Sequence, residues 1–351
     1  MSALADRLRT EIVRNETISV EHFVAAALYD PSEGFYCGPG QAGRSGDFLT
    51  AVEVGPLFGA VVSRAVDQWW EAAGRPERFV VAEHGAGPGT LGRAVTLAEG
   101  DCLRAGALQW VMIEPSDPQR SRHPTGPHLV SQVDDANLSH VDVVFANELL
   151  DNLPFGIVAY REGSWVERRV GLDGDRFVLR DGEKVSPPPG LGSETPTLGA
   201  ELPILRGASA WLGERRERFP ESRMVLLDYA APTVALLARE AGWLRAFRNH
   251  QLGRDWLSAP GTQDITVDIP IEQVAVFEPT QTLTQAEFLH RYGIDELVEQ
   301  GRQIWQERAA IGDLVALRGR SRANEAAALL DPDGMGAFRV FVWAPSDQTV
   351  S

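Results

Sequence analysis

Three glycines at alternate positions, Gly85, Gly87 and Gly89, follow the apolar run at residues 79–83. The chain then becomes favourable to helix, so the pattern predicts a strand, a tight turn and a helix. Glycine has no Cβ atom, and its backbone can approach a ligand more closely than that of other residues. In parallel sheets ligands bind beyond the carboxyl ends of the strands, where this turn would lie. By themselves the glycines leave open whether the turn binds a ligand or only joins a strand to a helix.

An acidic residue, Glu114, ends the next apolar run, at residues 108–114. A carboxylate at the end of the strand after a glycine turn can accept both hydroxyl groups of a ribose. The alternative is an exposed acid at a strand end, without a ligand. Together with the glycine turn, Glu114 favours a nucleoside ligand.

Two residues that flank the glycines bear on which nucleoside binds. A nicotinamide enzyme is expected to show G-x-G-x-x-G, but here the spacing is G-x-G-x-G, with Thr90 where the third glycine would fall. Glu83 would repel a pyrophosphate and suits a ligand with a positive end. S-adenosylmethionine has a sulfonium, an ammonium, a free ribose and no phosphate. The sequence therefore favours S-adenosylmethionine as cofactor over a nicotinamide dinucleotide.

A third polar group lies in "FANELLDNLPF", residues 145–155, at the end of a later apolar run. Asn147, Glu148 and Asp151 would gather there, where a methyl group would be delivered. Methyl transfer depends mostly on positioning the acceptor and preparing it as a nucleophile. A guanidinium acceptor would need carboxylates, because it stays protonated in water. Asp151 and Asn152 could instead cap a following helix.

The elements that must position these residues alternate between strands and helices. Apolar runs without polar alternation predict strands that are buried on both faces, as in a parallel sheet covered by helices. Six such runs occur, at residues 79–83, 108–114, 127–132, 141–147, 223–230 and 336–344. The sequence therefore predicts an α/β fold.

Further stretches surround this predicted sheet. Residues 1–75 predict a helical cap that contains a long Gly-, Pro- and Ser-rich loop. Residues 156–220 alternate apolar and polar residues around glycine turns, which predicts an antiparallel, β-rich insertion. Residues 284–318 predict a helix in two pieces. We expect the core to comprise residues 76–155 and 221–345, with the insertion on the acceptor side.

Composition and charge exclude several classes of partner. The formal net charge is −16 and no segment is strongly basic, so we expect no nucleic-acid partner. Cys37 and Cys102 are the two cysteines, which predicts neither a disulfide framework nor a metal site. We find no apolar signal-peptide core and no run of about 18 apolar residues. The expectation is a cytoplasmic protein without a membrane partner.

Several motifs in chain order resemble one known family. They include "GDFLT", "EHGAGPGTL", "IEPS", "ANELLDNLPF", "FRNHQ" and "PGTQDIT". The sequence resembles the S-adenosylmethionine-dependent methyltransferases that include the mitochondrial complex I assembly methyltransferase and its bacterial relatives. The resemblance runs from about residue 18 to the C-terminal strand.

This resemblance implies a class I methyltransferase fold, Rossmann-like, with a seven-stranded sheet whose last strand is antiparallel. It implies cofactor contacts at Glu83, Gly85, Gly87, Glu114, Gly46 and Asp47. It also implies an acceptor-side role for His250, and a protein arginine as acceptor in the mitochondrial members.

The sequence departs from the family pattern at a few positions. The family usually has a proline at the position of Ala86, whereas this chain has it two residues later, at Pro88. Ala230 stands where a glycine is more usual, and an expected histidine is missing near Val267. The last two departures fall near the acceptor side, so they bear on the substrate more than on the cofactor.

We therefore expect a methyltransferase that uses S-adenosylmethionine and methylates a protein side chain, arginine by resemblance. The expected catalytic residues are Glu148, Asn147, Asp151 and His250. A small-molecule acceptor, a non-catalytic assembly factor with the same fold and a nicotinamide oxidoreductase are the alternatives. The oligomeric state stays open, with a homodimer among the possibilities.

Overall fold

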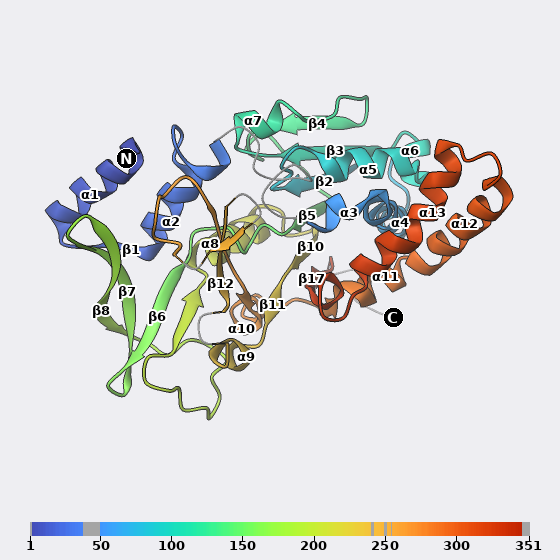
Figure 1. Cartoon of the computed structure of the whole chain (residues 1–351). Helices are drawn as coiled ribbons and strands as arrows, with labels where there is room; N and C mark the ends of the chain where they lie inside the picture. Colours follow the sequence, from blue (N-terminus) through green and yellow to red (C-terminus); the bar gives the residue numbers. More distant parts are fainter. Residues whose placement is uncertain (1, 38–49, 240–241, 249–250, 254, 346–351) are drawn as a thin grey trace. The chain divides into compact units, whose positions relative to one another are not determined.

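The computed structural model describes residues 2–37, 50–239, 242–248, 251–253 and 255–345, and Figure 1 shows its elements. The chain divides into two compact units. We call one the core unit; it comprises Leu49–Glu148, Phe219–Asp228 and Pro279–Ser351. The other, the N-terminal unit, comprises Met1–Phe48, Leu149–Arg218 and Tyr229–Glu278.

The core unit is built on a seven-stranded sheet in the order β16-β17-β10-β5-β2-β3-β4. The five strands from β10 to β4 are parallel, and β17 runs antiparallel to β10 and to β16. This confirms the predicted class I fold with an antiparallel last strand. The strands are β2 (Phe79–His84), β3 (Leu108–Ile113), β4 (Leu129–Gln132), β5 (Val143–Asn147), β10 (Arg223–Asp228), β16 (Gln281–Thr284) and β17 (Arg339–Trp343).

The central strand β2 is buried along its whole length, as its continuous apolar run predicts. It lies between β3 and β5, with His84 opposite Ile113 on one side and Ala146 on the other. The carboxyl ends of β2, β3 and β5 therefore meet at one edge of the sheet. The glycine turn, Glu114 and Glu148 all follow these ends directly.

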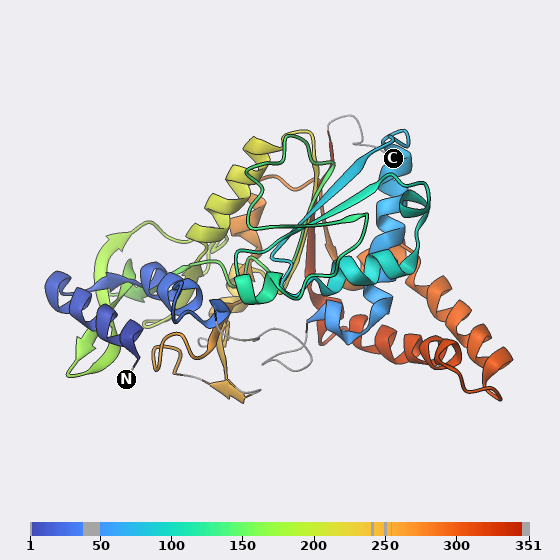
Figure 2. The same cartoon turned by 90° about the horizontal axis from the view of Figure 1, so that it is seen from above.

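Helices of the core unit pack on this sheet and on one another. At the contact of α4 with α5 a Cβ atom on Gly59 would lie 2.3 Å from the Cβ atom of Ala94, so only glycine fits there. Three helices follow β16, where the sequence predicted one helix in two pieces. The helical segment breaks at Gly312, which has a positive φ angle, and the side chain of Asp313 caps the next helix by accepting from the amide of Ala316. The helices are α3 (Ala51–Val54), α4 (Pro56–Ala72), α5 (Thr90–Ala98), α6 (Asp101–Arg104), α7 (Asp117–Arg120), α11 (Gln285–Arg291), α12 (Ile294–Arg308) and α13 (Leu314–Leu329), with a 3-10 turn at Met335–Ala337. In both views α12 and α13 lie side by side as a hairpin (Figures 1 and 2).

The N-terminal unit contains the predicted antiparallel insertion. Its largest sheet has the order β1-β7-β6-β9, with β8 paired to β7. These strands are β1 (Ile18–Ser19), β6 (Gly156–Arg161), β7 (Ser164–Asp173), β8 (Arg176–Val185) and β9 (Glu201–Ile204). The unit also holds the helices α1 (Ala3–Asn15), α2 (Val20–Tyr29) and α8 (Arg206–Arg218), and a 3-10 turn at Phe35–Cys37.

Two small sheets complete the N-terminal unit. In one, β11 (Ala230–Ala231) pairs in parallel with β15 (Ile269–Pro270). In the other, β12 (Leu244–Arg248) pairs antiparallel with β13 (Gln251–Gly253) and β14 (Asp264–Val267). The short helix α9 (Thr233–Leu237) lies between β11 and β12 in the sequence, and α10 (Ile271–Ala275) directly follows β15.

The division into units differs from the segments expected from the sequence. Residues 1–75 do not form one cap: Ile18 and Ser19 pair with β7 of the insertion, whereas α4 packs on α5 in the core unit. Residues 229–278 join the N-terminal unit, although the sequence assigned them to the core. The pairing of β1 with β7 joins residues about 150 positions apart, and local periodicity carries no information on such a contact.

Candidate functional site

The glycine turn forms the predicted link between β2 and α5. Gly85, Gly87 and Gly89 all have positive φ angles, of 68°, 52° and 73°, a backbone region that favours glycine. The amides of Gly85 and Ala86 both donate to the carbonyl oxygen of Ile113, at 3.0 and 3.2 Å, which ties the turn to the end of β3. A Cβ atom on Gly87 would meet no atom within 4 Å. The turn is therefore a fixed backbone cradle, open at its central glycine.

Glu114 lies directly beside this cradle. One carboxylate oxygen accepts from the amide of Gly87 at 3.0 Å, and the other accepts from the amide of Ser116 at 2.8 Å. The side chain is 9% exposed. Burial raises the pKa of Glu114, while the two amide hydrogen bonds and the charge of Arg120 act in the opposite direction. The structure thus joins Glu114 to the glycine turn through the amide of Gly87.

Glu83, the last residue but one of β2, is also buried, with 5% of its surface exposed. Its carboxyl oxygen accepts from the indole Nε1 of Trp110, on β3, at 2.5 Å. Burial raises the pKa of Glu83 to about 8; the Trp110 hydrogen bond lowers it, and the charge of Glu114 raises it further. Two acidic groups therefore lie at the end of β2 and β3, an arrangement that favours a cationic ligand.

Two histidines that the sequence reasoning did not assign also lie at this edge. The ring of His123 contacts the carbonyl oxygen of Gly87 through Nε2 and the hydroxyl of Ser131 through Nδ1, both at 2.8 Å. Burial lowers the pKa of His123. Burial thus favours the neutral ring, in which Nε2 donates to the carbonyl and Nδ1 accepts from the hydroxyl. His123 supports the turn at its central glycine.

The other histidine, His84, is buried at the end of β2. Its Nε2 lies 3.7 Å from a carboxylate oxygen of Asp135, and the two residues are 4% and 5% exposed. Asp135 follows β4 in the sequence "VDDAN". The acids directly after that strand were a signal that the sequence reasoning did not use.

Glu148 lies at the end of β5 with an unusual backbone. Its φ angle is +53°, in the left-handed region that costs a residue other than glycine roughly 1–2 kcal/mol. Its carboxylate oxygen accepts from the Asn147 side-chain amide and from the backbone amide of Ala51, each at 3.0 Å. Its own amide donates to the carbonyl oxygen of Leu227 at 2.8 Å. A strained residue that is held by its surroundings is a common feature of functional sites.

The third polar residue of that motif, Asp151, belongs to the N-terminal unit. Its carboxylate accepts from the hydroxyls of Tyr229 and Thr266. It is 1% exposed, and burial raises its pKa. No helix follows it among the described residues, because a turn leads directly to β6, so the helix-cap alternative is wrong. These two hydrogen bonds join Asp151 to other segments of its own unit.

A second buried carboxylate accompanies Asp151 in the N-terminal unit. Asp264 accepts from the hydroxyl of Tyr36 at 3.0 Å, from the side-chain amide of Asn152 at 3.1 Å and from the amide of Ile265 at 3.0 Å. Burial and the charge of Asp151 raise its pKa to about 7. These contacts join three segments of the unit that are distant in the sequence.

Three predicted residues, Gly46, Asp47 and His250, lie outside the described residues. Within the described ranges no cluster of His, Cys, Asp and Glu could hold a metal ion. None of the helices in that part of the chain is long and apolar enough to cross a membrane.

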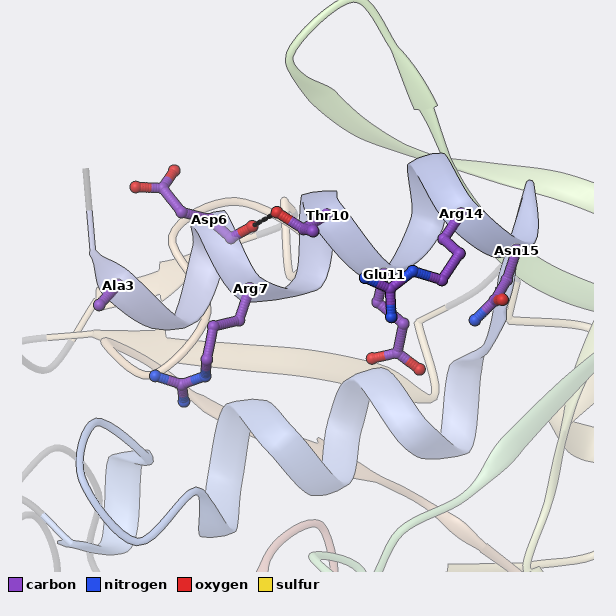
Figure 3. Close-up of a pocket in the computed structure, with 7 residues that line it drawn as sticks. All are labelled: Ala3, Asp6, Arg7, Thr10, Glu11, Arg14 and Asn15. Carbon is purple, nitrogen blue, oxygen red and sulfur yellow. Dashed lines mark hydrogen bonds between the residues drawn. The ribbon is translucent and has the colours of Figure 1, made fainter.

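A pocket along α1 in the N-terminal unit is drawn in Figure 3. Residues of this one helix line it, and the hydroxyl of Thr10 donates to the carbonyl oxygen of Asp6 at 2.9 Å. Its charged side chains form ion pairs such as Arg7–Asp30 and Arg9–Asp6. It is a solvated helix face and contains no predicted site residue.

Comparisons with known proteins identify the family. Residues 61–289, more than half of the chain, match a family model described as "Putative S-adenosyl-L-methionine-dependent methyltransferase". A relative from Drosophila melanogaster, named "Protein arginine methyltransferase NDUFAF7 homolog, mitochondrial", is 28% identical over 78% of this chain and 69% of its own length. The NDUFAF7 protein of Danio rerio, with a similar name, is 24% identical over 85% of this chain and 78% of its own.

A solved structure supports the same assignment. A protein from Burkholderia thailandensis, crystallised with bound S-adenosyl-homocysteine, superposes with a TM-score of 0.83 at 25% sequence identity. The match covers 97% of this chain and 92% of that one.

One expectation from the sequence is corrected by these comparisons. The cytoplasmic location does not stand, because the curated relatives are named as mitochondrial proteins. The expectation rested on a missing apolar signal core, whereas mitochondrial presequences are amphipathic and Arg-rich and need no such core.

The family match, the curated relatives and the shared fold lead to one conclusion: this chain belongs to the family of S-adenosyl-L-methionine-dependent methyltransferases, and it is an enzyme that uses S-adenosylmethionine as its cofactor.

Proposed function

We propose that this enzyme transfers the methyl group to an arginine side chain of a protein. The single observation that carries the proposal is Glu148, a half-buried carboxylate held in a strained conformation at the end of β5, next to the strand that leads into the glycine turn. The names of the curated relatives, which are protein arginine methyltransferases, support the same acceptor.

The residues around the turn fit the cofactor. Gly87 leaves open space where a side chain would stand, and we propose that Gly85 and Gly87 admit the methionine end there. Glu114 would hold the ribose hydroxyls, and the buried carboxyl of Glu83 would favour the positive charge. Gly46 and Asp47 stay predictions as further contacts.

Glu148 would bind and orient the acceptor. The cofactor supplies a methyl group on a positively charged sulfur. A guanidinium is also cationic and stays protonated in water, so a fixed carboxylate offsets the repulsion between the two cations and accepts hydrogen bonds from the guanidinium N–H groups. The Asn147 side chain and the Ala51 amide hold the carboxylate before the acceptor arrives, which reduces the entropy lost on binding.

The proposal is tested with methyl-labelled S-adenosylmethionine and a protein extract from cells that lack this chain. We expect the label in methylarginine after acid hydrolysis of the extract. Glu148→Gln should lower the transfer rate roughly ten- to a hundredfold, the effect of one charged hydrogen bond, and leave the affinity for S-adenosylmethionine within about twofold.

Glu99→Gln is the matched control. Glu99 lies in the same unit and has the same φ of +53°, but it is an exposed residue at the end of α5. Its variant should transfer methyl groups at the wild-type rate. Label in a small molecule would contradict the protein acceptor, label in another amino acid would contradict arginine, and cofactor binding without any transfer would support a non-catalytic factor.

A further inference from the structure

The hydrogen bond between Trp110 and Glu83 joins two buried residues of neighbouring strands. Trp110 is 0% exposed, and its Nε1 donates to Glu83 at 2.5 Å. The indole is closely enclosed: a Cβ atom on Gly92 of α5 would lie 3.0 Å from its Cδ1 and 3.1 Å from its Nε1. Phe145 of β5 packs near it, with ring centroids 6.3 Å apart. The direction of the indole N–H is therefore set by packing.

The polar atom of Trp110 needs an explanation that core packing does not supply. A phenylalanine would also bury an aromatic ring at this position, and it would bring no N–H group that needs an acceptor. A buried carboxyl in turn requires a fixed donor, or it loses both its orientation and its stability. The pair thus fixes the Glu83 carboxyl at the end of β2, directly before the glycine turn.

We propose that Trp110 is a positioning residue for cofactor binding, whose indole N–H holds the Glu83 carboxyl in the orientation that receives the positive charge of S-adenosylmethionine. This inference rests on the proposed role of Glu83 in the cofactor site. It adds a residue that none of the sequence motifs contains.

The hydrogen bond also affects the charge of Glu83. A donor to a carboxylate favours the ionised form, and Trp110 acts in that direction against the burial that raises the pKa of Glu83. Without the N–H group the carboxyl would ionise at a higher pH. The affinity for the cationic cofactor would then be lower at pH 7, and its increase with pH would occur at a higher pH than in the wild type.

The test is calorimetric titration of Trp110→Phe with S-adenosylmethionine between pH 6 and pH 9. The cationic cofactor binds the ionised form of Glu83, so its binding at pH 7 requires the carboxyl to lose its proton. We expect the dissociation constant at pH 7 to rise about tenfold or more in the variant, because the ionised carboxyl of the complex then lacks a hydrogen bond, and the pH profile to move upward. Trp69→Phe is the matched control, because Trp69 is also buried in the core unit and donates from Nε1 to the hydroxyl of Tyr292 at 2.9 Å. Its affinity and pH profile should stay as in the wild type.

A second background separates positioning from general damage. In a Glu83→Gln protein, Trp110→Phe should change the affinity by less than about twofold, because the charged partner is already absent. If the phenylalanine variant does not fold, benzothienylalanine is introduced at Trp110 instead. This residue keeps the shape of the indole ring but has no N–H group.

The outcomes distinguish this inference from the function on which it rests. Unchanged affinity and pH profile in Trp110→Phe or its benzothienyl counterpart, while the wild type binds, would overturn the positioning role alone. An equal loss in the Glu83→Gln background would do the same. If the wild type bound neither S-adenosylmethionine nor S-adenosylhomocysteine, the proposed cofactor site would fail as a whole, and this inference with it.

Discussion

Glu83→Gln should change how the stability of the protein depends on pH. The pKa of Glu83 is raised by burial from 4.5 to about 8. Folding therefore favours the protonated form, and the stability that this provides is complete below pH 4.5 and is lost as the pH rises through 8. One pKa unit corresponds to about 1.4 kcal/mol, so between pH 6 and pH 8 this group should remove roughly 2 kcal/mol from the free energy of unfolding.

Glutamine has nearly the shape of the protonated acid, keeps an acceptor for the Trp110 N–H and does not titrate. The assay is urea unfolding of both proteins, without cofactor, at pH 6, 7 and 8. Groups that titrate in both proteins cancel in the difference, which should shift by roughly 2 kcal/mol in favour of the variant over this range. Parallel stability curves would show that Glu83 does not titrate in this window, and the reasoning from its burial would be refuted.

Two further predictions concern the turn. Glu114→Ala should raise the dissociation constant for S-adenosylmethionine at least tenfold in calorimetric titration, because it removes a carboxylate that Gly87 holds at 3.0 Å; an unchanged constant would rule out a ribose contact. Gly89→Ala should lower the free energy of unfolding by roughly 2 kcal/mol or more, since its φ is +73° and its Cβ atom would lie 2.6 Å from Pro124. Gly74→Ala, with a φ of +84° and open space at the Cβ position, is the control and should lose about 1 kcal/mol; equal losses in urea unfolding would contradict the packing argument.

Some of the fold could not be found from local patterns. Strand β16 is only four residues long, and Gln281 and Thr282 on it are exposed, so no apolar run marks it. The strained backbone of Glu148 is equally invisible in the sequence, because glutamate has no preference for positive φ. Its conformation results from the hydrogen bonds that Leu227 and Ala51 make with it.

The sequence by itself determined six of the seven strands of the core sheet and the glycine turn, with Glu83 just before the turn and Glu114 at the end of the next strand. These features are local: buried parallel strands require continuous apolar runs, and the turn requires glycines where φ is positive. Only the tertiary structure decided that Trp110 holds Glu83, and that Asp151 pairs with Tyr229 and Thr266, residues 78 and 115 positions away. Such contacts depend on which strands and turns meet in space, and no periodicity along the chain records the partner of a buried polar group.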